Sequence, residues 1–148
     1  MASEVVLVQG TSIKISTTEV TDAGASPSPT FALMDCIGRE IQVQGGTSPE
    51  IDVTTLCSTA KEFRLGLADP GTMTITGHWV QGHAAHNVIR AAAADKQLRL
   101  IEISFVDGSI FKVLASVQQR SFSAAVDGVL TASYTFRLSG EAVEIDAP

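Results

Sequence analysis

The sequence predicts a mainly β protein: an antiparallel β-sandwich or partly closed barrel with one flanking α-helix. Three features predict this class. Apolar and polar residues alternate with a period of two along most of the chain, glycine-containing turn signals join the later alternating segments, and a single Ala-rich segment departs from the alternation. The 148 residues are expected to form one domain, 1–148, and a hydrophobic content of 45% suits a packed core.

Alternating segments recur from one end of the chain to the other. In 129–138, for example, Thr131, Ser133 and Thr135 oppose Tyr134 and Phe136. Each such strand is expected to bury one face and expose the other to water, as strands of antiparallel sheets do. The expected strands are 11–18, 37–43, 72–79, 101–105, 109–119 and 129–138, and a short strand rich in branched residues begins at residue 50.

Local signals indicate two hairpins and a helix. Asp107-Gly108 and Asp127-Gly128 supply the glycine that tight hairpin turns need. Residues 83–95 are Ala-rich, with apolar residues at helical spacing, so this segment is expected to form one amphipathic helix packed against the sheet.

Three stretches lack clear periodicity. Residues 21–30 contain Ser-Pro-Ser-Pro and are expected to form a mobile loop, and 141–148 are expected to form a short acidic tail. Residues 57–71 are also expected to form a mobile loop, longer than a simple connection requires. Within it Phe63, Leu65 and Leu67 alternate, and side chains of this kind must bury against the same subunit or against another one. These three residues are therefore candidates for an inter-subunit contact.

Composition argues against several classes of protein. Ten Lys and Arg against 16 Asp and Glu give a net charge of −6, and the cations are scattered, so affinity for nucleic acid is not expected. Cys36 and Cys57 fit no disulfide or metal spacing and are expected to be small buried residues. Residues 1–10 carry no basic segment and only a short apolar run, 5–8, which is expected to be a strand and not an export signal, so the chain is expected to fold in the cytosol.

A search for catalytic or ligand-binding residues finds no convincing set. His78, His83 and His86 lie near one another in sequence, but no cysteine or carboxylate completes a zinc site, so exposed or rim histidines are expected. Glycine pairs are not followed by a helix, and no nucleophile-elbow motif is present. We expect no catalytic residue, no cofactor and no metal, and hence no enzyme.

Several motifs resemble those of one family of structural proteins. The more specific motif is Glu-Ile-Asp-Val-Thr-Thr-Leu at 50–56 with the following segment 59–67, which contains Glu62-Phe63 and Gly66-Leu67. With Gly10-Thr11, the Asp-Gly hairpins and the closing segment 126–141, the chain resembles the major tail tube protein family of lambda-like siphophages over residues 10 to about 143.

The resemblance implies a β-sandwich with one helix that assembles into hexameric rings stacked as a hollow tube. It further implies that double-stranded DNA passes through the lumen without specific binding. The implied partners are further copies of the chain and the tape-measure, tail tip and tail terminator proteins, and the implied location is the virion tail, assembled in the host cytoplasm.

A lumen needs a polar lining, and two strand faces can supply it. The first candidate set is Thr131, Ser133 and Thr135, and the alternative set is Thr72, Thr74 and Thr76. Two other functions remain open at this point: a related tube protein of a secretion or contractile injection system, and a soluble ligand-binding β-barrel. The latter is disfavoured because eight aromatic residues leave few to line a pocket.

Overall fold

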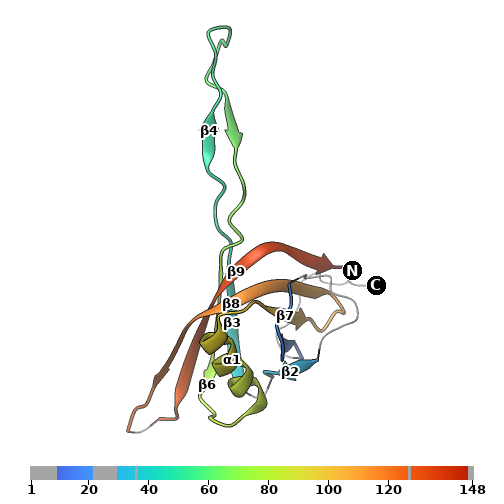
Figure 1. The fold of residues 1–148 in the computed structure, drawn as a ribbon, viewed down its shortest axis with the longest axis vertical. Coiled ribbons are helices and arrows are strands. Elements are labelled where there is room, and N and C mark those ends of the chain that lie inside the picture. The colour runs from blue at the N-terminus through green and yellow to red at the C-terminus, as the bar shows by residue number, and fades with distance from the viewer. Residues whose placement is uncertain (1–9, 22–29, 36, 127, 147–148) are drawn as a thin grey trace, which may run out of the picture.

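A computed structural model of the protein describes residues 10–21, 30–35, 37–126 and 128–146. It contains an antiparallel seven-stranded sheet, a separate two-stranded ribbon and one α-helix (Figure 1). The elements are β1 (Ser12–Ser16), β2 (Phe31–Leu33), β3 (Gly38–Gln44), β4 (Glu50–Asp52), β5 (Phe63–Leu65), β6 (Thr72–His78), α1 (Ala84–Asp95), β7 (Arg99–Ser104), β8 (Ile110–Ser123) and β9 (Thr131–Ile145). No helix in these described ranges is long and apolar enough to cross a membrane.

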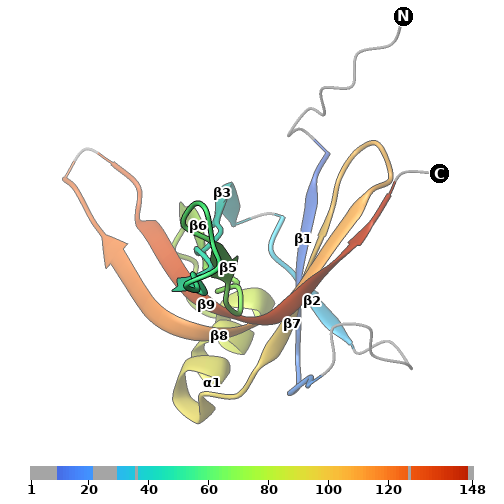
Figure 2. The ribbon, with the colours of Figure 1, turned by 90° about the horizontal axis from the view of Figure 1, so that it is seen from above.

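The sheet is strongly curved but not closed. Its strand order is β2-β1-β7-β8-β9-β6-β3, and the long strands β8 and β9 lie near its centre and follow its curve (Figure 2). The β8–β9 register shifts between Lys112 and Leu114 and again between Val117 and Gln119, and such bulges bend a ribbon. The bend turns β1 towards β3, so that a Cβ atom placed on Gly38 would lie 3.8 Å from the side chain of Ile13. The predicted class, mainly β with one helix, is confirmed.

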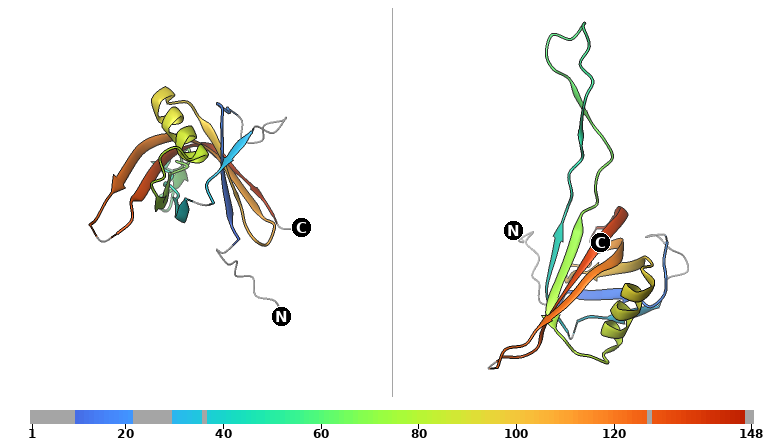
Figure 3. Two further views of the ribbon diagram at one scale, coloured as in Figure 1. Left: turned by 90° about the horizontal axis from the view of Figure 1, so that it is seen from below. Right: turned by 60° about the vertical axis from the view of Figure 1, so that its left-hand side comes forward.

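The core packs between strands of the large sheet and helix α1. It is built mainly from branched and aromatic residues on β1, β6, β7, β8 and β9, such as Ile15, Ile75, Ile101 and Phe136, all at most 1% exposed. Helix α1 covers part of the core and contacts β8, β2 and β1, with Ile89 fully buried (Figure 3). The alternation seen in the sequence therefore becomes an apolar inner face and a polar outer face.

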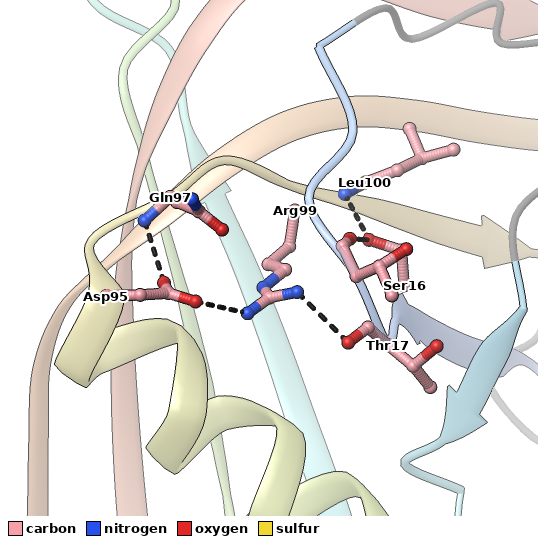
Figure 4. A network of polar contacts seen from close by, with 7 residues as sticks. Ser16, Thr17, Asp95, Gln97, Arg99 and Leu100 are labelled. Atoms are coloured by element: carbon pink, nitrogen blue, oxygen red, sulfur yellow. Dashed lines mark hydrogen bonds and ion pairs between the residues drawn. The ribbon is translucent and has the colours of Figure 1, made fainter.

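Polar contacts attach the end of α1 to the neighbouring strands (Figure 4). The buried Arg99 side chain lies 2.7 Å from the carboxylate of Asp95 in the last helical turn, and it donates a 3.0 Å hydrogen bond to the carbonyl oxygen of Thr17. Beside it, the Leu100 amide donates to the hydroxyl of Ser16 at 2.9 Å. These bonds join α1, β1 and β7 where the helix returns to the sheet.

Three local predictions are wrong, and one short strand was not predicted. The 57–71 segment is not an aperiodic loop throughout, because its residues Phe63–Leu65 form β5 and pair with β4. The 141–148 segment is not simply a tail, because β9 continues to Ile145 and pairs there with Ile110 of β8. The short strand β2 was not predicted, since three residues are too few to show a period. Cys57 is exposed, not buried.

Other predictions are confirmed or lie outside the described residues. The Asp107-Gly108 turn is present, with Gly108 at φ +98° and its amide bonded to the Phe105 carbonyl at 3.0 Å. Residues 5–8, most of the 21–30 loop, Cys36 and Asp127 fall outside the described ranges.

Candidate assembly interface

The two sets of lumen candidates lie on the same face of adjacent strands. In the β6–β9 register, Thr74 is opposite Thr135 and Thr76 is opposite Ser133. Thr72 and Thr131 continue the same two rows and face Arg137 and His78, respectively. The sequence presented these sets as alternatives, whereas the structure brings them together.

Polar residues of two further strands extend this face. On β3, Glu40, Gln42 and Gln44 are opposite Thr76, Thr74 and Thr72. On β8, the residues opposite the β9 positions 137, 135, 133 and 131 are Ser116, Gln119, Ser121 and Ser123. The strands β8, β9, β6 and β3 thus share a continuous polar surface, here called the polar face, opposite the core.

The lower part of the polar face is hollowed. A depression of about 460 Å³ crosses all four strands and is lined by residues that include Glu40, Thr76, Ser121, Thr131 and Ser133. These side chains are hydroxyl-bearing or acidic, and the lining also includes Arg39 and Phe122. The depression is therefore largely polar and holds no cluster of cations among the described residues.

The upper end of the polar face holds one ion pair. A single guanidinium nitrogen of Arg137 lies 2.8 Å from both carboxylate oxygens of Asp69. The contact with Arg137, followed by a hydrogen bond from the Gly71 amide, lowers the pKa of Asp69 below its ordinary value. Asp69 therefore offsets the charge of an arginine that shares the row of Thr131, Ser133 and Thr135.

This four-strand unit has two unpaired edges. β3 pairs only with β6, and β8 pairs with β7 only through residues 110–115, so its distal part, 116–123, has no partner on that side among the described residues. Exposed strand edges of this kind are templates for pairing with another chain. Both outer edges of the four-strand unit therefore have backbone groups that can pair with another chain.

A second exposed feature is the arm, defined as residues 45–71, which projects far from the sheet (Figure 1). β4 and β5 pair along it, and near its end Ser58 donates a 2.8 Å hydrogen bond to Glu62. Its apolar side chains are exposed in the subunit, with Phe63 at 50%, Leu65 at 70% and Leu67 at 94%. Among the described residues, this subunit does not bury them.

An apolar groove lies beside the arm base. Its volume is about 550 Å³, and it is lined by residues that include Val43, Leu67, Pro70, Phe111 and Leu138. The groove therefore lies between Val43 of β3, residues 67–70 of the arm and the β8–β9 pair.

The histidines form no metal site. Within the described ranges, no group of three or more His, Cys, Asp or Glu side chains could hold an ion. His86, expected at the rim, is instead 1% exposed, with Nδ1 3.1 Å from the Tyr134 hydroxyl and its ring 4.5 Å from that of Trp79. Burial, followed by the nearby charges of Arg120 and Arg90, lowers the pKa of His86, which favours the neutral ring. The buried position of His86 could not be predicted from the sequence, because Tyr134 and Trp79 become its neighbours only in the folded chain.

Comparison with solved structures shows a shared fold. The SPP1 tail tube has a TM-score of 0.68 at 14% identity, over 95% of this chain and 78% of that one. The tail of a gene transfer agent particle has a TM-score of 0.65 at 15% identity, over 91% and 95% of the two chains. A sheath/tube terminator of an extracellular contractile injection system has a TM-score of 0.68 at 7% identity, over 99% and 100%.

Comparison with protein families is more specific. No curated protein sequence matches the chain. The family described as phage tail tube, lambda-like, matches residues 4–111, which is most of the chain but ends before the resemblance expected to about residue 143. Together with the fold shared with assembled tail tubes, this match shows that the chain belongs to the lambda-like phage tail tube family, whose members are structural components of the virion tail.

Proposed function

We propose that copies of this protein form hexameric rings that stack into a tube, and that double-stranded DNA passes through its lumen. The observation that carries the proposal is the four-strand unit, which combines a polar, hollowed face with two unpaired edges. Six-fold symmetry is a property of the related gene transfer agent tail and supports the ring size.

The strand directions allow the ring to close. β8, β9, β6 and β3 are successively antiparallel, so β3 and β8 run in opposite directions. A rotated copy can therefore place its β8 edge, 116–123, beside β3 and continue the same antiparallel pattern. Repetition of that contact makes a closed barrel without free edges, the general solution to edge-to-edge aggregation.

The polar face is proposed as the wall of the lumen. Its candidates are Thr72, Thr74 and Thr76 on β6 and Thr131, Ser133 and Thr135 on β9. Hydroxyl groups keep the wall hydrated, and the pairing of Arg137 with Asp69 limits the cationic charge available to phosphates. Both properties favour passage of DNA over its retention.

The arm is proposed as the contact between rings. Its exposed side chains Phe63, Leu65 and Leu67 lie well outside the sheet, and burial of such residues is the usual source of interface energy. An element that reaches beyond its own subunit suits a contact along the tube axis. The expected further partners are the tape-measure, tail tip and tail terminator proteins, with assembly in the host cytoplasm.

Two alternatives are less well supported. The fold alone is also found in contractile injection and type six secretion systems, so fold does not select DNA as the cargo, whereas the family match favours a phage tail. Neither of the two larger hollows is an enclosed ligand cavity, since one crosses the polar face and the other opens beside the arm. No catalytic role is proposed.

The test combines electron microscopy with proline substitutions in β3. Concentrated protein should give stacked rings with six-fold symmetry. Successive residues of a strand point their N–H groups in opposite directions, so Gln42→Pro and Val43→Pro remove one donor to β6 and one outward donor.

The variant that loses the hydrogen bond to β6 should melt at a lower temperature. The variant that loses only the outward donor should keep the melting temperature of the wild type yet form no rings. Normal tubes from the variant with the unchanged melting temperature would contradict β3 as the edge that joins subunits.

A further inference from the structure

The base of the arm is closely packed around two glycines. Gly71 has a φ of +96°, and a Cβ atom there would collide with the carbonyl oxygen of Gln44. A Cβ atom on Gly46 would likewise collide with Asp69. The two limbs of the arm, the outgoing chain from residue 45 and the returning chain to residue 71, therefore lie in close contact at the base.

At the base of the arm, polar contacts join the returning limb to β9. The carbonyl oxygen of Gly71 accepts hydrogen bonds from the Leu138 amide at 3.1 Å and from Arg137 at 3.4 Å. The Asp69 carboxylate accepts from the Gly71 amide at 2.8 Å and pairs with Arg137 at 2.8 Å. Asp69 and Arg137 thus link the limb to the sheet through their side chains.

Beyond the base, the described hydrogen bonds of the arm lie within the arm itself, either inside one limb or between the two limbs, and none reaches the sheet. Examples are the Gly66 amide to the Pro49 carbonyl at 2.7 Å and the Val53 amide to the Glu62 carbonyl at 3.0 Å. They stiffen the arm but do not orient it relative to the sheet. A small rotation at the base consequently moves the arm end through a large distance.

We propose that Asp69 and Arg137 are positioning residues whose ion pair sets the direction of the arm, and thereby the ability of the subunit to stack. The stacking part rests on the proposed function, whereas the direction of the arm is a property of the subunit. The Arg137 and Asp69 side chains are 47% and 39% exposed, so salt screens their attraction and global stability depends little on it.

Asp69→Asn tests the pair selectively. Asparagine keeps the side-chain oxygen that accepts from the Gly71 amide but removes the charge that attracts Arg137. Asp107→Asn is the matched control, since the Asp107 carboxylate accepts from the Ser109 amide at 2.9 Å in a similar turn and has no cationic partner in the described structure. Arg137→Gln completes the series by removing the cation of the pair.

The readout is the distance between spin labels on the subunit. One label is placed on Cys57 in the arm and the other on a cysteine replacing exposed Gln118 of β8, with Cys36 changed to Ala throughout. We expect the ratio of the wild-type distance to other distances to fall by up to about fivefold in Asp69→Asn and Arg137→Gln, the upper end for an exposed ion pair. Asp107→Asn should leave this ratio unchanged, and 1 M salt should move the wild type towards Asp69→Asn.

Unchanged distances in both single variants would overturn the proposal. The rate of tube assembly is measured in parallel. Altered distances with wild-type assembly would retain the positioning of the arm but remove its role in stacking. Failure of the wild type itself to form tubes would count against the proposed function, and the distances would still decide the role of the pair.

Discussion

At the scale of single residues, the phenylalanines separate a folding role from an assembly role. Phe136 is fully buried in the core, whereas Phe63 is half exposed on the arm. Deletion of a buried aromatic ring leaves a cavity, whereas deletion of an exposed ring mainly removes a partner surface. The two residues are thus a matched pair for experiment.

Phe63→Ala is expected to leave the melting temperature of the subunit nearly unchanged and to weaken assembly by about 2 kcal/mol or more per interface. Phe136→Ala should instead lower the free energy of unfolding by about 3–5 kcal/mol. Thermal melts and the critical concentration for tube formation measure the two effects. A large loss of subunit stability with undiminished tube yield in Phe63→Ala would assign Phe63 to folding.

His86 makes stability dependent on pH. Burial, the nearby cations Arg120 and Arg90, and His83 lower its pKa in the folded state, while Tyr134 faces its Nδ1 atom. Because the folded state favours the neutral ring, its contribution is complete above the unfolded pKa of about 6.5 and declines as the pH falls below that value.

The expected result is a fall in melting temperature between about pH 7 and pH 5 that is smaller in His86→Gln than in the wild type. His78→Gln is the control, since His78 lies at the end of β6, is only partly buried and is not among the groups that lower the pKa of His86. Equal slopes for the wild type and His86→Gln would show that His86 does not carry the pH dependence.

At the scale of elements, the arm and the sheet differ in how they are stabilised. β6 and β9 each bury alternate residues and pair along their length, whereas β4 and β5 are exposed at every position. An exposed ribbon with few hydrogen bonds opens readily in the free subunit. Assembly should protect it by covering its apolar side chains.

Amide hydrogen exchange tests this contrast. Residues 50–65 should exchange fast in a verified monomer and slowly in tubes, whereas 73–77 should exchange slowly in both states. The expected cause is ordering on association, as when any mobile segment gains a partner. Slow exchange across the arm of the free subunit would argue against it.

At the scale of the whole molecule, charge in the proposed lumen can be changed without touching the core. Thr131 and Thr135 lie on the polar face, and their side chains point away from the buried Ala132 and Tyr134. Lysine at both positions is repeated in every subunit of every ring. Each cation adds a salt-dependent phosphate contact, so the sum along the tube should retain DNA.

We expect Thr131→Lys with Thr135→Lys to assemble but to deliver DNA slowly, with partial recovery at higher ionic strength. Asn87→Lys with Ala91→Lys, on the exposed side of α1, is the control with equal added charge. DNA delivery by fully assembled particles is the measurement. Normal delivery at low salt by the β9 variant would exclude this strand from the lumen wall.

Much of the sheet was predictable because its determinants are local. A period of two between apolar and polar residues placed most strands of the large sheet, and helical spacing in the Ala-rich segment placed α1, which spans Ala84–Asp95. The arm was harder to predict. The short strand beginning at residue 50 was expected and corresponds to β4, whereas β5, with three residues and no buried face, lies in a segment expected to be a loop. The candidate residues of the lumen wall were named from alternation alone, but as two separate sets.

The sequence by itself determined the mainly β class, the single helix, the family and the polar and apolar faces of each strand, because these depend on residue type and near neighbours. Only the tertiary structure decided how those faces combine. Strand register joins Thr74 to Thr135. Packing of the arm base and of α1 against the sheet brings Asp69 to Arg137 across 68 positions and places His86 against Tyr134. Such pairings depend on which distant strands become neighbours. That choice minimises the free energy of the whole chain, and no local pattern records it.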